Sequence, residues 1–149
     1  RGVIQDTFET SITWERANTF IEEIKRDIAK TIEEISGKPC LVTCRITHSY
    51  PDGLAPYFTF AAFATSSTMI EIWKEIKLAT NAICITKGGT VTHHHAVGRD
   101  HRPNGYDNQR PDLFKDILTA AKSKVDPNGI MNPGVLIDPE NKNIYNWLK

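Results

Sequence analysis

The sequence predicts an α+β domain in which an antiparallel sheet carries both of its helices on one face. Four short segments are rich in residues that favour strands, partly in alternation with polar residues. In two longer segments the apolar residues recur every three or four positions, as on amphipathic helices. The segments follow one another as strand, helix, strand, strand, helix, strand, which is the split βαββαβ order of a ferredoxin-like fold. We expect a C-terminal helix and an extended tail after this unit.

Three of the predicted strands precede a segment rich in histidine. Residues 2–12 form the first. Residues 41–50 and 57–63 form a hairpin, because the turn residues Pro51, Asp52 and Gly53 lie between them. The fourth strand is expected from residue 90 onward, where Thr90, Val91 and Thr92 favour extended backbone.

The two helices of the sheet unit are predicted from their apolar spacing and their end signals. The first covers residues 14–35, with Thr13 at its start and Gly37 at its end. The second begins near Thr68 and ends at about Lys87. The C-terminal helix is expected from residue 111 or 112 to about 125, after a polar surface loop over residues 98–111.

Composition excludes several functional classes. Of the 149 residues, 18 are Lys or Arg and 18 are Asp or Glu, so the zero net charge gives no case for nucleic acid or an anionic membrane. No apolar run is long enough to span a bilayer.

Cys40 and Cys44 are too far apart on a strand for a disulfide, so we expect reduced thiols and a cytoplasmic protein. The chain lacks an initiator Met, which suggests a piece of a longer protein.

The main functional signal is the run His93-His94-His95. On a strand, alternation would place His93 and His95 on one face and His94 on the other. Three interpretations compete: half-exposed polar strand residues, a metal site, and a wall of hydrogen-bond donors and proton carriers around a cofactor or substrate. We favour the third.

The metal interpretation needs a third ligand beside His93 and His95. The candidates are Asp100, His101, Asp107 and the distant His48.

Several segments resemble one family of flavoproteins. They are residues 8–11 with Trp14 and Arg16, residues 43–50 and 57–60, residues 88–98 from Gly-Gly-Thr-Val through the histidines to Ala-Val-Gly, and residues 125–130. In order and spacing they are similar to the C-terminal part of alkyldihydroxyacetonephosphate synthases and their microbial FAD-linked oxidase relatives, which belong to the vanillyl-alcohol-oxidase type. The resemblance extends to about residue 137.

The resemblance implies a division of labour between two domains. In the family, an N-terminal domain binds FAD and a C-terminal cap with a ferredoxin-like sheet covers the isoalloxazine ring. Residues 1–149 match the cap as a single domain, so FAD is expected in the full-length parent and not on this fragment. The expected partners are the FAD-binding domain of the same parent chain, a small-molecule or lipid-like substrate, and a second copy in a homodimer.

The resemblance also implies roles for individual residues. Tyr57 matches a catalytic tyrosine that transfers a proton. His93, His94 and His95 match catalytic histidines that line the site, with His94 and His95 beside the flavin. Arg45 and Arg99 match cationic substrate-binding positions, and Asn132 resembles a tail residue that approaches the flavin. The plainer interpretations are an aromatic packed in a hairpin for Tyr57, a surface salt bridge for Arg45 and an ordinary turn for Asn132.

Two reactions and one other class of protein stay open. A synthase-type parent, active in ether lipid biosynthesis, would exchange an acyl chain for a fatty alcohol without net redox change, whereas an oxidase-type parent would oxidise a hydroxy acid or alcohol. Thr59 and the loop after Arg99 depart from the synthase pattern. A stand-alone metal-binding or dimerisation module is the alternative from another class.

Overall fold

A computed structural model describes residues 2–138 of the chain. Its longer elements are β1 (Gly2–Glu9), α1 (Ala17–Ser36), β3 (Leu41–Ser49), β4 (Gly53–Ala64), α2 (Met69–Thr86) and α4 (Asp112–Val125). Shorter ones are β2 (Ile12–Thr13), the helical turns Trp14–Arg16, Arg99–His101 and Arg102–Tyr106, and α3 (Asp107–Gln109). None of the helices in this described part is long and apolar enough to cross a membrane.

Strand β4 is the centre of the sheet, and every pairing is antiparallel. Strand β1 pairs with it from Glu9 opposite Tyr57 to Gly2 opposite Ala64, and the short β2 continues along β4 at Leu54 and Gly53. Strand β3 pairs with β4 as the predicted hairpin. The turn between them closes through a hydrogen bond from the amide of Tyr50 to the carbonyl of Gly53.

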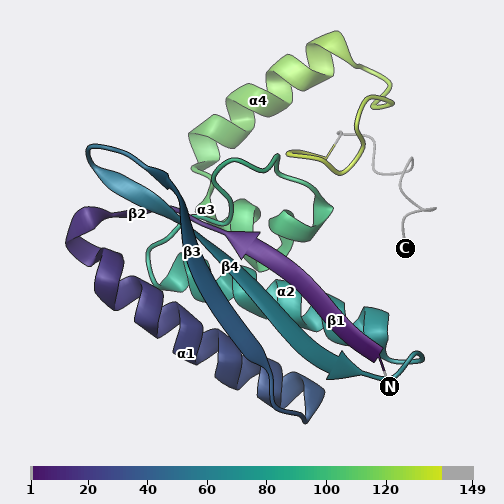
Figure 1. The fold of residues 1–149 in the computed structure, drawn as a ribbon. Helices are drawn as coiled ribbons and strands as arrows, with labels where there is room; N and C mark the ends of the chain where they lie inside the picture. Colours follow the sequence, from purple (N-terminus) through teal and green to yellow (C-terminus); the bar gives the residue numbers. More distant parts are fainter. Residues whose placement is uncertain (1, 139–149) are drawn as a thin grey trace.

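Both long helices cover the same face of the sheet (Figure 1). Alternation along the strands turns Phe8, Phe58 and Phe60 toward them, and these rings are almost fully buried. Helix α1 contributes the predicted apolar stripe, Phe20, Ile24, Ile28 and Ile32, each at most 1% exposed. The α1 helix ends at Gly37, whose φ of 64° is the left-handed conformation that glycine adopts easily. The antiparallel sheet with helices on one face is therefore confirmed.

Helix α2 also fixes β1 by polar contacts. The indole nitrogen of Trp73 donates to the carboxylate of Asp6 at 2.7 Å. The ammonium of Lys77 donates to the backbone carbonyl of Thr7 at 2.9 Å and lies 3.2 Å from the same Asp6 carboxylate. These bonds hold the end of β1 in place, where the next residues reach the candidate site.

The opposite face of the sheet carries no helix of the described chain (Figure 1). Large apolar side chains on this open face lie in contact with solvent: Val3 is 57% exposed, Leu41 61% and Phe63 49%. Their strand positions put them near one end of the sheet, whereas Glu9 and Tyr57 pair near the other. The three thiols are free, as expected.

The prediction of a fourth strand through the histidines was wrong. Residues 89–98 are irregular and pair with no strand of the described chain. Thr90, Val91 and Thr92 have the composition of a strand, but the backbone amides that follow are occupied by a side chain, as described below. Strand 2–12 is likewise interrupted at Thr10 and Ser11.

The C-terminal third differs from the prediction in its loop. The C-terminal helix is confirmed as α4. Residues 98–111 form short helical turns that pack on α2. The extended tail predicted after α4 is, over residues 126–138, a series of turns that brings Ile137 into a buried position. The predicted polar end, residues 139–149, lies outside the described residues.

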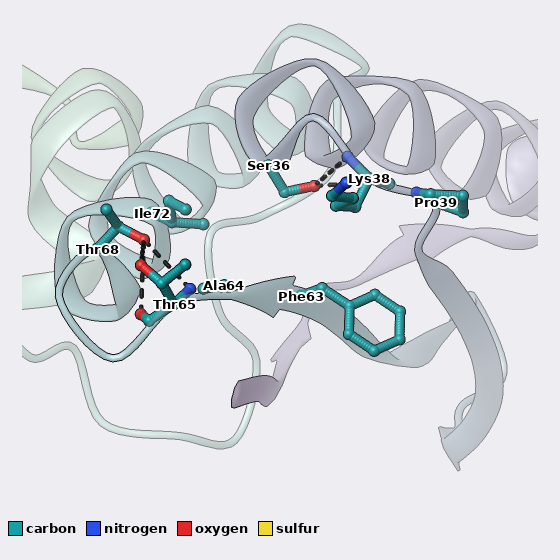
Figure 2. A pocket seen from close by; sticks show the side chains of 8 residues that line it. All are labelled: Ser36, Lys38, Pro39, Phe63, Ala64, Thr65, Thr68 and Ile72. Atoms are coloured by element: carbon teal, nitrogen blue, oxygen red, sulfur yellow. Dashed lines mark hydrogen bonds between the residues drawn. The ribbon is translucent and has the colours of Figure 1, made fainter. Parts of the chain in front are cut away.

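A cavity of about 370 Å³ lies between the end of α1 and the start of α2 (Figure 2). Ser36, Lys38 and Pro39 line one side, and Phe63, Thr68 and Ile72 are among the residues of the other. Because Phe63 pairs with Val3, six residues along β4 from the pairing of Tyr57 with Glu9, this cavity is remote from the candidate site.

Replacing Phe58 with alanine is expected to lower the free energy of unfolding by about 3–5 kcal/mol. Its ring is fully buried and stacks on Phe8 with the ring centroids 4.8 Å apart. The matched control, Phe63→Ala on the open face, should cost less than about 1 kcal/mol. Urea denaturation of both variants measures the difference, and equal losses would contradict this account of the core.

Candidate functional site

The histidine segment is held to the end of β1 by a set of hydrogen bonds across the chain. The amide of Thr90 donates to the hydroxyl of Thr10 at 2.9 Å. The amide of Ser11 donates in return to the hydroxyl of Thr90 at 3.0 Å. Thr10 is fully buried, so its side of this clamp is shielded from water, whereas Ser11 and Thr90 are half-buried. Residues about 80 positions apart are thereby fixed side by side.

Glu9 completes the clamp. Its carboxylate oxygen Oε1 accepts the backbone amides of His93, His94 and His95 at 2.5, 2.9 and 3.0 Å, and also the hydroxyl of Thr92. Burial of Glu9 raises its pKa, but the bonds from Thr92 and the three amides outweigh burial, so the pKa lies below its usual value. The carboxylate is therefore ionised at neutral pH.

The second carboxylate oxygen of Glu9 faces the imidazoles. Oε2 lies 3.1 Å from Nδ1 of His94 and 3.7 Å from Nδ1 of His93. The Glu9 side chain is only 1% exposed, yet Oε2 has no hydrogen-bond partner of acceptable geometry. A buried, unsatisfied acceptor is uncommon and identifies a strained or functional position.

Glycines permit the close approach of this segment to the core. A Cβ at Gly89 would lie 2.6 Å from both the Phe20 ring and the Thr10 hydroxyl. Gly88 has a φ of 85°. The Gly-Gly pair therefore lets the chain turn after the end of α2 and come close enough to the core for Thr90 to bond to Thr10.

Tyr57 lies on β4 with its side chain on the open face. Its hydroxyl donates to that of Thr7 on β1 at 3.1 Å. The guanidinium of Arg45 on β3 lies over the Tyr57 ring, 4.6 Å from its centroid, in a cation–π contact. The rings of His94 and His95 lie 6.0 and 5.8 Å from the ring of Tyr57. A phenol, a guanidinium and two imidazoles thus share one small surface.

Tyr50 and His48 extend the cluster along β3. The Tyr50 hydroxyl lies 3.1 Å from Nε2 of His93, and the His48 ring centroid lies 5.1 Å from that of His93 and 4.8 Å from that of His94. An irregularity between Ile46 and His48 brings His48 opposite Ala55, on the same face as Tyr57. A cavity of about 450 Å³ opens beside His93 and Tyr50.

The structure brings most of the predicted site residues together and separates two of them. Tyr57, Arg45 and the three histidines meet on the open face. Arg99 instead donates to the carbonyl of Pro133 at 3.1 Å. Asn132 occupies a turn with a φ of 45° and lines a hollow beside α4.

The predicted division of the histidines between two faces was wrong, since residues 89–98 are not a strand. His93 and His94 both face Glu9 and His48. The plain interpretation of Arg45 as a surface salt bridge does not hold either, since its guanidinium stacks on Tyr57.

The structure changes the ligand set of the metal interpretation. One potential ligand atom each from His48, His93 and His94 lie within 4.8 Å of one another. Among the other predicted ligands, Asp107 pairs with Arg102 and Arg110. Nδ1 of His101 accepts the amide of Gly98, and burial lowers the pKa of this imidazole.

Sequence reasoning assigned no role to Glu9 and Tyr50 and gave His48 only as a remote ligand candidate. Glu9 follows the buried Phe8, where alternation predicts a side chain on the other face of the sheet. The alternation therefore indicated the face of the sheet on which Glu9 lies. Its partners, however, are amides of a segment more than 80 residues away, and no spacing in the sequence predicts them.

Comparison with known proteins identifies the class. The chain matches the family model described as "FAD linked oxidases, C-terminal domain" over residues 1–136. It therefore belongs to the family of C-terminal domains of FAD linked oxidases.

Individual relatives of the chain carry a more specific name than the family model. The alkyldihydroxyacetonephosphate synthase of Caenorhabditis elegans is 31% identical over 145 residues, which are 92% of this chain and 23% of that protein. The synthase of the same name from Trypanosoma brucei brucei is 29% identical over 134 residues, 89% of this chain and 21% of that protein. A solved alkyldihydroxyacetonephosphate synthase structure shares the fold, with a TM-score of 0.56 at 21% identity over 84% of this chain and 19% of that one. The chain thus spans about a fifth of the length of these relatives.

Replacing Glu9 with glutamine is expected to destabilise the folded state at neutral pH and much less in acid. Because the pKa of Glu9 is below its usual 4.5 in the folded state, its ionised form contributes stability that is fully present above pH 4.5. That contribution is lost as the pH falls through the lower, folded-state pKa. Denaturation of both proteins across the acid range should show the gap in unfolding free energy closing, and a gap independent of pH would refute the assignment.

Proposed function

We propose that this chain is the cap of an FAD-dependent enzyme of the alkyldihydroxyacetonephosphate synthase type, and that its open sheet face covers the flavin and substrate. The observation that carries the proposal is the meeting of Tyr57, Arg45 and the histidine triplet on that face. Titratable and cationic groups of this kind are typical of a surface that closes over a reacting molecule.

His94 and His95 fit a contact with one face of the flavin ring of such a cofactor. His94 keeps a third of its side chain exposed while its backbone is fixed, so its imidazole can present a hydrogen-bonding group to a ring system placed against the sheet. His95 lies beside it and also has a fixed amide. When bound, FAD would supply the electron-accepting isoalloxazine ring. The pyrophosphate and adenosine would be held by the preceding domain of the parent chain.

Tyr57 is the proposed proton donor or acceptor at the substrate. Its hydroxyl is held by Thr7, and the cation of Arg45 over its ring favours negative charge that develops on the phenol oxygen. Arg45 is also the cation best placed on this face to bind an anionic substrate group. The proposed roles of Arg99 in substrate binding and of Asn132 at the flavin rest on the family resemblance, because in this structure both lie with the tail segment.

Substitution of Tyr57 by phenylalanine, or of His94 by alanine, is expected to lower turnover of the full-length protein by about 10²–10⁴-fold, because each change removes a group that transfers or stabilises a proton. The substrates to test are an acyl dihydroxyacetonephosphate with a long-chain alcohol. The visible flavin spectrum should persist in both variants, since neither residue would bind the pyrophosphate.

The matched control is Tyr106→Phe, which removes a phenol from the short helical turn before α3. Wild-type turnover in the Tyr57 and His94 variants would overturn the proposed roles. Turnover of a hydroxy acid or alcohol with reduction of the flavin, in place of alcohol exchange, would assign the parent to the oxidase type.

A second candidate function is a metal site at His48, His93 and His94, favoured by the 4.8 Å grouping of their ligand atoms. If it exists, the purified full-length protein should contain about one equivalent of zinc or iron. His48→Ala should then remove the metal. Absence of stoichiometric metal after purification without chelators would eliminate this candidate.

A further inference from the structure

We propose that Glu9 is the positioning residue of this site, with separate tasks for its two carboxylate oxygens. Oε1 fixes the backbone of the histidine segment, and Oε2 holds a proton on Nδ1 of His94, which leaves Nε2 of that imidazole as the lone-pair side. The inference deepens the proposed function and rests on it for the catalytic consequence, whereas the structural tasks stand on the geometry alone.

The first task follows from the number of donors around Oε1. Three consecutive amides, those of His93, His94 and His95, converge on this one atom together with the Thr92 hydroxyl. Consecutive amides that point to one anion form a concave backbone arrangement that an isolated chain does not keep. The anion here is part of the protein, so the segment is fixed before any substrate arrives.

The second task follows from the unsatisfied state of Oε2. The Glu9 side chain is 1% exposed and its Oε2, a carboxylate oxygen, has no hydrogen-bond partner, so it needs a donor close by. Nδ1 of His94, at 3.1 Å, is the nearer of the two imidazole nitrogens that it faces. A small rotation of the ring aligns an Nδ1–H with Oε2 and removes the unfavourable unpaired acceptor.

The tautomer of His94 decides which of its two ring nitrogens can accept a proton. In a neutral imidazole only one nitrogen carries hydrogen, and the bond made by one nitrogen sets the role of the other. With the proton on Nδ1, Nε2 of His94 is free to accept a proton at the open face near Tyr57. Carboxylate–imidazole pairs of this kind orient and fix the tautomer of acid–base histidines in other enzymes.

Glu9→Gln separates the two tasks. The four donors around Oε1 require the amide oxygen of the new side chain at that place, so its NH2 group must occupy the place of Oε2. A donor then faces Nδ1 of His94 and forces the proton onto Nε2. Glu9→Ala removes both tasks. Glu71→Gln, an exposed carboxylate on α2, is the matched control.

The experiment uses the full-length protein in these three variants, with the flavin spectrum and thermal midpoint as checks of folding. Hydrogen exchange of the peptide covering residues 92–96 reports the first task. Nitrogen-15 shifts of histidine rings, with His94 assigned by its loss in His94→Asn, report the second. Steady-state kinetics give kcat and KM.

We expect Glu9→Gln to keep more of the amide protection than Glu9→Ala and to keep KM, to show the proton of His94 on Nε2, and to lose at least about 100-fold in kcat, as when a catalytic histidine is left in the wrong tautomer. Glu9→Ala should also lose the protection. If that variant fails to fold, the glutamine variant still tests both tasks.

Unchanged exchange in Glu9→Ala would overturn the backbone task, as would lost protection in a folded Glu9→Gln. An Nδ1 proton retained in Glu9→Gln, or a kcat within twofold of wild type, would overturn the second. Exchange and ring shifts need no turnover, so they distinguish failure here from failure of the proposed function, which the Tyr57 and His94 substitutions test.

Discussion

The buried carboxylate of Glu9 is the constraint on which the open face of this domain depends. It lies at the end of β1, and its partners lie more than 80 residues further along the chain. Hydrogen bonds to a charged acceptor are stronger than neutral ones, about 1.5–3 kcal/mol each. That strength offsets the cost of removing the charge from water and lets an irregular segment hold one conformation without strand pairing.

The two faces of the sheet have opposite characters because of the alternation along each strand. One side is an apolar layer against α1 and α2, formed by phenylalanine and isoleucine. The other has a polar centre around Tyr57 and the histidines, and exposed apolar residues such as Leu41 and Phe63 near the far end. Neighbouring apolar side chains left in contact with solvent are typical of a place where another part of a protein packs. This agrees with a domain that is the C-terminal part of a larger FAD-linked oxidase chain.

The sequence predicted regular structure better than it predicted the site. The periods of α1, α2 and α4 are local properties, and a helix must place its apolar residues at these intervals whatever the rest of the chain does. Tyr57 and Arg45 could be placed on one hairpin for the same reason. The histidine segment could not, because Thr90, Val91 and Thr92 favour a strand while the amides after them bond to Glu9. Local preference gave way to a contact that only the folded chain creates.

The irregularity between Ile46 and His48 in β3 changes the phase of the strand. Before it, Thr43 and Arg45 face the open side opposite Thr59 and Tyr57. With strict alternation His48 would turn toward α1, but the extra residue, Thr47, returns it to the open side beside His93 and His94. Whether the residue at position 48 belongs to the site therefore depends on the extra residue in β3 as much as on its being a histidine. Regular pairing of all the residues, with Thr47 opposite Ala55, would put a hydroxyl in the place of this imidazole and turn His48 to the helical side, although no residue of the sequence had changed.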